Sequence, residues 1–193
     1  MTPTTPSPSS ATDAECLALT RGLRRRGTVV LSVFGLVWAF AGASGITASA
    51  ASVTIEALAV LLTGVAIFLA YRKGAAPSPR LVSLPANWSR GVGIVNMVEV
   101  VAIFAVIAAS NASGHPVFIP VGIALVVGLH FFPLARLFDQ WQYRWTAVAV
   151  TVAALVGLAL VAAGLSSESV RAVVGLATWA ALWVSACHVG VRG

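Results

Sequence analysis

The chain has 193 residues, of which 59% are hydrophobic and 9% are charged, and its net charge is +6. Soluble domains carry roughly 25% charged residues, so this composition excludes a soluble globular protein and indicates an integral membrane protein. The positive charge does not indicate nucleic-acid binding, because the basic residues cluster at the ends of apolar segments instead of forming a stripe on a polar domain. We expect the lipid bilayer as its surroundings and no nucleic acid as a partner.

The N-terminal stretch is rich in Thr, Pro, Ser and Ala and has few apolar side chains to bury. Residues 1–20 are therefore expected to form a disordered tail. A basic block from Arg21 to Arg26 follows, directly before the first long apolar run. Residues 21–193 are expected to form a single transmembrane domain, because the remaining chain leaves no room for a second, soluble one.

Long apolar segments recur along this transmembrane domain. A transmembrane helix needs about 20 apolar residues to cross roughly 30 Å of hydrocarbon. Lipid admits only helices and closed barrels, and the segments lack the alternation of a barrel strand. The sequence therefore predicts an all-α fold, a bundle of six transmembrane helices. They are expected at residues 28–46, 52–71, 91–110, 117–138, 145–165 and 170–190.

The links between these segments alternate between basic and nearly uncharged. If both termini lie in the cytoplasm, eleven of the twelve Lys and Arg residues fall on the cytoplasmic side, and only Arg171 lies outside. This distribution follows the positive-inside rule. The three short outer links predict three antiparallel hairpins, formed by consecutive pairs of helices. We therefore expect a multi-pass protein of the plasma membrane with both termini cytoplasmic.

The first apolar segment has an alternative interpretation. Arg24, Arg25 and Arg26, the apolar run after them and the string from Ala48 to Ala50 imitate a signal peptide with a cleavage site. The run is longer than the roughly 7–15 residues usual in such a peptide, so we expect an uncleaved helix. Cleavage would leave five spans and move the N-terminus outside. The mass of the mature protein distinguishes the two.

Glu99 is the most informative single residue. It lies roughly 13 Å from the cytoplasmic end of the third segment, by the rise per residue of an α-helix, and thus close to the bilayer centre. An ionised carboxylate at that depth costs a few kcal/mol. Glu99 is therefore expected to face the bundle and to be either paired or protonated. Asn96 lies three residues earlier and shares its helical face.

His130 is expected at the same depth on the neighbouring fourth segment. The turn between the two segments is centred near Gly114 and His115, and Glu99 and His130 lie about equally far from it along the chain. In an antiparallel pair of helices, residues equidistant from the turn lie at equal depth. Depth does not fix the rotation of either helix, so the two side chains can still point apart.

Asn96 falls at the level of Pro133 by the same counting. Proline has no N–H, so Pro133 leaves the carbonyl of Leu129 without its helical partner. Buried backbone in lipid requires a partner, and the Asn96 amide is a candidate donor. Pro133 is also expected to make the fourth helix easier to deform.

The expected cluster of Asn96, Glu99 and His130 has two interpretations. A Glu–His pair can hold or pass a proton, and ionisable residues within a membrane are functional candidates by default. Alternatively, the pair only holds two helices together, as an interhelical hydrogen bond worth ~0.6–2 kcal/mol. Glu56 lies about one turn inside the outer end of the second segment, where it either snorkels to the interface or begins a polar path inward.

Enzyme and cofactor chemistry find little support in the sequence. The two cysteines, Cys16 and Cys187, do not have the spacing of metal ligands, and the common nucleophile, phosphate-loop and metalloprotease motifs are missing. A haem held by His130 and His188 fits by depth alone. We therefore expect no cofactor, no metal and no catalytic residues.

The string GLHFFPLARLF (128–138), followed by an aromatic-rich linker and another apolar helix, resembles a pattern in a family of small, uncharacterised bacterial multi-pass membrane proteins. The similarity covers the fourth helix and the start of the fifth. It implies a six-helix protein of the bacterial inner membrane, brings no known activity, and singles out His130, Phe132, Pro133 and Leu134.

Two functions follow as expectations, and an intramembrane enzyme is a third, less favoured one because no nucleophile or metal constellation is found. The first is a small transporter or channel for protons, ions or a small polar solute, in which Glu99 and His130 titrate and Asn96 orients them. The second is a non-catalytic partner that stabilises or regulates another membrane protein, or a second copy of itself, through its lipid-facing helices. A cavity that ends at Glu99 favours the first, and a dry, packed interior favours the second.

Overall fold

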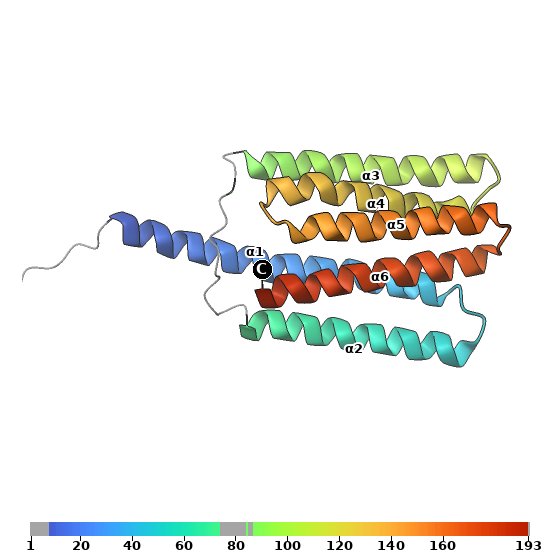
Figure 1. The fold of residues 1–193 in the computed structure, drawn as a ribbon, viewed down its shortest axis with the longest axis horizontal. Helices are drawn as coiled ribbons and strands as arrows, with labels where there is room; N and C mark the ends of the chain where they lie inside the picture. The colour runs from blue at the N-terminus through green and yellow to red at the C-terminus, as the bar shows by residue number, and fades with distance from the viewer. Residues whose placement is uncertain (1–7, 74–83, 85–86, 193) are drawn as a thin grey trace, which may run out of the picture.

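The computed structural model describes residues 8–73, 84 and 87–192, and the side chains of residues 18–72, 84 and 87–190. These residues form six α-helices and no strand (Figure 1). The helices are α1 (Pro8–Ala43), α2 (Ser49–Lys73), α3 (Trp88–Ala112), α4 (Phe118–Leu137), α5 (Gln142–Ala162) and α6 (Ser167–Arg192).

Each of the six described helices is long and apolar enough to cross a membrane. The predicted all-α bundle of six transmembrane helices is therefore confirmed, and the chain is a multi-pass membrane protein. The helices α2 to α6 begin and end within a few residues of the expected positions. Hydrophobicity alone was sufficient to locate them, because a span must supply a fixed length of apolar chain.

The largest difference from the expected boundaries lies at the N-terminus. The helix α1 begins at Pro8, so residues 8–20, expected as part of a disordered tail, continue the first transmembrane helix. This stretch contains Ala, Leu and Glu, which favour helix. A helix that extends an existing one also avoids the cost of nucleation. The rest of the expected tail, residues 1–7, lies outside the described residues.

Successive helices run in opposite directions, so their ends gather at two ends of the bundle (Figure 1). The end that contains Arg26, Arg136 and Arg144 is called the basic end here. The other, called the hairpin end, contains the turns α1–α2, α3–α4 and α5–α6. Gly114 and Gly164 close two of these turns with φ values of +72° and +77°, a conformation that glycine adopts without a steric penalty.

Four helices, α1, α4, α5 and α6, form the packed core. The contact of α1 with α6 is the most extensive and that of α4 with α5 comes next. Both depend on glycine: a Cβ added to Gly175 in α6 would lie 2.5 Å from the Cα of Gly42 in α1, and one added to Gly128 in α4 would lie 2.8 Å from the backbone nitrogen of Thr151 in α5. Small residues permit such close approach of helices in membranes.

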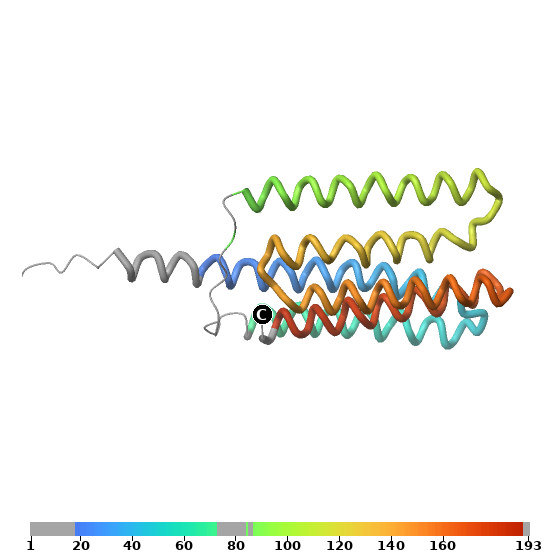
Figure 2. Tube along the Cα trace, turned by 45° about the horizontal axis from the view of Figure 1, so that its top comes forward, coloured from blue at the N-terminus to red at the C-terminus, as the bar shows by residue number. Residues whose placement is uncertain are grey.

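The helices α2 and α3 lie on opposite flanks of this core (Figures 1 and 2). The helix α2 packs against α1 and α6, whereas α3 packs against α4 alone. None of the most apolar stretch of α3 is buried inside the protein, compared with 44% of that of α1. The helix α3 is therefore a peripheral helix that the rest of the bundle holds only through α4.

Candidate functional site

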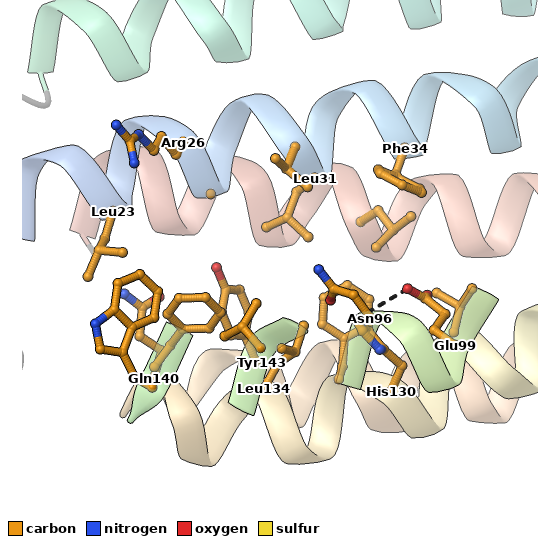
Figure 3. Close-up of a pocket in the computed structure, with 18 of the residues that line it drawn as sticks. Leu23, Arg26, Leu31, Phe34, Asn96, Glu99, His130, Leu134, Gln140 and Tyr143 are labelled. Carbon is orange, nitrogen blue, oxygen red and sulfur yellow. Dashed lines mark ion pairs between the residues drawn. The ribbon is translucent and has the colours of Figure 1, made fainter. Parts of the chain in front are cut away.

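Glu99 and His130 meet between α3 and α4. The Nε2 atom of His130 lies 3.5 Å from Oε2 of Glu99, and the two side chains are 8% and 16% exposed, respectively. Figure 3 shows the carboxylate and the imidazole turned toward each other, with a dashed line between them. Glu99 lies near the middle of the span Trp88–Ala112. The structure thus brings these two predicted site residues together at mid-span.

The rotation of the two helices explains why the side chains meet. Among the described helices, α3 packs against α4 alone. The face of α3 that meets α4 carries Glu99, because an ionised carboxylate that faced lipid would cost a few kcal/mol. The imidazole lies near the backbone of Val95, but its Nδ1 atom is buried without a partner that satisfies hydrogen-bond geometry. One ring nitrogen of His130 therefore faces the carboxylate, and the other remains available for a proton.

Asn96 lies beside the pair on α3 (Figure 3) and lines the same cavity. The structure contains no hydrogen bond from its amide to the carbonyl of Leu129, the contact that the sequence suggested. The helix α4 runs without interruption through Pro133, from Phe118 to Leu137. Asn96 instead remains exposed at the cavity wall.

Glu56 lies apart from this cluster. It is half-buried in the second turn of α2, near the hairpin end. The helix α2 packs against α1 and α6 and has no contact with α3 or α4, and Glu56 does not line the cavity beside Glu99. A polar path that begins at Glu56 therefore stays a prediction from sequence alone.

A cavity of about 490 Å³ adjoins the Glu99–His130 pair. It lies between α1 on one side and α3 and α4 on the other, where α1 and α3 do not pack against each other. Its walls are mostly apolar, with Leu31 and Phe34 from α1 and Val127 from α4 among them. Its volume falls within the ~300–1,000 Å³ typical of sites for small molecules.

Three polar side chains that the sequence analysis missed line the cavity nearer the basic end: Arg26, Gln140 and Tyr143. Gln140 and Tyr143 are 5% and 7% exposed. The Tyr143 hydroxyl reaches α1, because a Cβ added to Gly27 would lie 3.0 Å from it. Figure 3 shows Arg26 on α1 and Gln140 across the cavity from it, both far from Glu99, with Tyr143 between Gln140 and Glu99. No spacing in the sequence links them, since α1 and the α4–α5 turn are far apart along the chain.

The charges that line the cavity are unevenly arranged. Glu99, His130 and Arg26 are the titratable or charged side chains in the lining apart from the Tyr143 phenol. Glu99 and His130 face each other, whereas no ion pair is found for Arg26 among the described residues. The cavity thus has a pair that can exchange protons at mid-span, a free cation toward the basic end, and an apolar wall between them. Among the described residues, no three His, Cys, Asp or Glu side chains gather into a group that could hold a metal.

Comparisons with known proteins do not assign the chain to a family. No protein-family description, no curated protein and no solved structure matches it. The resemblance of residues 128–138 to a bacterial membrane-protein pattern therefore stays an expectation from the sequence. The functional conclusion rests on the geometry of the Glu99–His130 pair and of the cavity beside it.

Proposed function

We propose that the protein is a small membrane transporter in which the Glu99–His130 pair exchanges a proton while a solute occupies the cavity. The observation that supports this proposal is that the pair forms part of the wall of a 490 Å³ cavity. A pair that only locked α3 against α4 would need no cavity beside it. A transporter needs one, because its ionisable groups must meet the solute.

Charge balance gives the pair a means of coupling. With one proton shared between carboxylate and imidazole, the pair has no net charge. Removal of that proton leaves a charge of −1, and addition of a second leaves +1. Either charge is costly within the apolar part of a membrane, unless the cavity holds a compensating charge. Protonation of the pair and occupation of the cavity by a charged solute therefore favour or oppose each other.

The orientation is part of the same proposal. The basic end is assigned to the cytoplasm and both termini with it, because cytoplasmic flanks of spans are rich in Lys and Arg. The cavity extends from Glu99 toward residues of the basic end such as Trp88 and Gln140. The described conformation is then the one in which the solute is exchanged on the cytoplasmic side.

Proton uptake into proteoliposomes tests the proposal. Vesicles that contain a trapped pH-sensitive dye, under an imposed potential, are expected to acidify faster with the protein than without it. Glu99→Gln should abolish the difference, because an amide cannot ionise. Glu56→Gln is the matched control, since it removes a membrane carboxylate that does not line the cavity. Equal uptake by vesicles with and without the protein, or unchanged uptake with Glu99→Gln, would contradict the proposal.

A second candidate function is that of a membrane partner that acts through α3. The supporting observation is that α3 packs against α4 alone and exposes large apolar side chains, among them Met97, Val101 and Phe104, at 60% or more. Native mass spectrometry from lipid nanodiscs tests for a homo-oligomer through this face. A dimer that Val101→Trp dissociates would favour this function, whereas a monomer would leave α3 to the lipid.

A further inference from the structure

We propose that the ligand of the cavity is a single-chain anionic amphiphile. Its anionic group would lie at Arg26, and its apolar chain would follow the cavity wall toward Glu99 and His130. The inference rests on the proposed function, because it names the substrate class of the same site. It replaces the small polar solute that the sequence alone suggested, for reasons of wall chemistry, charge and access.

The walls of the cavity select an apolar ligand. Between its two polar ends the cavity is lined by aliphatic and aromatic side chains, such as Leu31, Phe34 and Leu134. A small polar solute would lose water there and gain few hydrogen bonds, which is costly. The lining residues of α4 and its end extend from Val127 to Phe138, a length of roughly 16 Å by the helical rise. That length suits one alkyl chain of medium size, and the volume is too small for an intact two-chain lipid.

The charge of the lining selects an anion. Glu99 and His130 face each other, whereas Arg26 has no ion pair with any side chain that the structure describes. Two hydrogen-bond donors lie at the same end. The Tyr143 hydroxyl makes no hydrogen bond within the described part of the chain. The side-chain oxygen Oε1 of Gln140 accepts a hydrogen bond from Nε2 of Gln142 at 2.9 Å, which leaves the side-chain nitrogen of Gln140 to donate. Arg26 lies on α1, apart from both donors (Figure 3), so the cation alone favours a carboxylate or phosphate and repels a quaternary ammonium group.

The gap between α1 and α3 offers access from the bilayer. These helices do not pack against each other, and lining residues on both sides of the gap are exposed, with Val30 of α1 at 53% and Val100 of α3 at 47%. A single-chain amphiphile in the bilayer holds its anionic group at the interface and its chain among the apolar spans. Arg26 belongs to the basic block that flanks the first span. The positive charge of the cavity and the anionic group of the amphiphile therefore both lie at the membrane interface.

Photo-crosslinking locates such a ligand directly. The probe is a dodecanoate analogue with a diazirine near the end of its chain, added to the full-length protein in nanodiscs of zwitterionic lipid. Peptide mapping is expected to find the label on cavity-lining segments of α1, α3 and α4. Excess dodecanoate should remove the label, whereas dodecanol, which is neutral, and dodecyltrimethylammonium, which is cationic, should not. Competition by a lysophosphatidylglycerol, compared with dodecanoate, shows whether a phosphate or a carboxylate is preferred.

Two pairs of variants test the proposed binding mode. Arg26→Gln should weaken competition by dodecanoate about fivefold, from the loss of one basic residue at the membrane surface. Arg144→Gln is the control, because it removes an exposed arginine of the basic end that does not line the cavity. Val30→Trp should fill the gap and abolish labelling, whereas Val33→Trp, exposed on α1 but outside the lining, should leave it unchanged.

The outcomes separate this inference from the proposed function. Equal competition by the acid, the alcohol and the ammonium compound would overturn the inference, and so would equal effects of Arg26→Gln and Arg144→Gln. Label spread evenly over lipid-facing residues would overturn it as well. Loss of proton uptake in Glu99→Gln together with any of these results would leave the transporter proposal standing with another ligand. Specific labelling without any proton uptake would support an anionic ligand and contradict proton transport.

Discussion

The interface between α1 and α6 and the interface between α3 and the rest of the bundle differ in how they are built. At the first, Gly42 and Gly175 let two backbones touch, and buried Thr28 donates a hydrogen bond of 3.2 Å to the Ala186 carbonyl. At the second, α3 packs against α4 only and leaves a cavity on the side that faces α1. Backbones touch at the first interface, and the ionisable pair lies at the second.

This difference does not follow hydrophobicity, because α3 and α4 are the more apolar helices, whereas α1 and α6 make the more extensive contact. Within a membrane, apolar side chains gain little by moving from lipid to protein, so close packing and hydrogen bonds decide which helices associate. In the α1–α6 interface the pair Gly42 and Gly175 lets two backbones meet. In the α3–α4 interface Gly91 and Gly122 meet side chains only, and Glu99–His130 adds a polar contact. The predictions below test whether the two regions are held in these two ways.

The largest effect is expected from a methyl group in the close interface. Gly175→Ala places a Cβ 2.5 Å from the Cα of Gly42, and such overpacking of a filled core costs about 1–3 kcal/mol. Gly93→Ala in α3 is the matched control, because its Cβ would meet no atom within 4 Å, and alanine favours helix over glycine. Thermal unfolding in lipid nanodiscs should show a lower midpoint for Gly175→Ala and an unchanged or higher one for Gly93→Ala. The same midpoint shift in both would remove the distinction between the two regions.

A smaller effect is expected from the pair that holds α3. The coupling between Glu99 and His130 should amount to ~0.6–2 kcal/mol, the range of polar contacts between membrane helices. It is measured by a double-mutant cycle with Glu99→Gln, His130→Leu and the double variant, from unfolding in mixed micelles. Additive effects of the two single variants would show that the 3.5 Å contact contributes nothing to the attachment of α3.

The smallest effect is expected from the hydroxyl pair between α5 and α6. Thr146 and Ser185 lie 2.6 Å apart, and each also bonds a carbonyl of its own helix. Since the Ser185 hydroxyl that remains in Thr146→Val keeps the Ala181 carbonyl as its acceptor, this substitution should cost only about 0.6 kcal/mol. Thr54→Val is the control, because its exposed hydroxyl bonds only Ala50 of its own helix. A cost above that of Gly175→Ala would mean that polar contacts, and not close packing, dominate the core.

The sequence was sufficient to locate the six spans and to give their antiparallel order, but not to find the start of α1 at Pro8. Span length located the helices, because the thickness of the hydrocarbon fixes the length of apolar chain that a span needs. The alternation of basic and nearly uncharged links gave the antiparallel order. The dominance of the α1–α6 contact was not foreseen. Glycines such as Gly42 and Gly175 mark helices that can approach closely, but in a chain with 17 glycines they do not identify which helix meets which.

The candidate site could be foreseen only in part, for a related reason. The depth of Glu99 and His130 follows from counting along one hairpin, which is local information. The positions of Arg26 and Tyr143 along the cavity depend on how α1 and α5 pack across the bundle, and no counting rule connects them. Asn96 was a candidate donor to the Leu129 carbonyl, and that hydrogen bond is not formed, because equal depth along the hairpin does not set the direction of a side chain.

The touching backbones of Gly42 and Gly175 lie toward the hairpin end of α1, far from Arg26. Close to Arg26, Thr28 also donates a hydrogen bond to the Ala186 carbonyl of α6. The span of α1 is therefore fastened to α6 near both of its ends, and a wider gap beside α3 requires α3 to move away from α1. A ligand that needs more room would displace α3 and leave α1 in place.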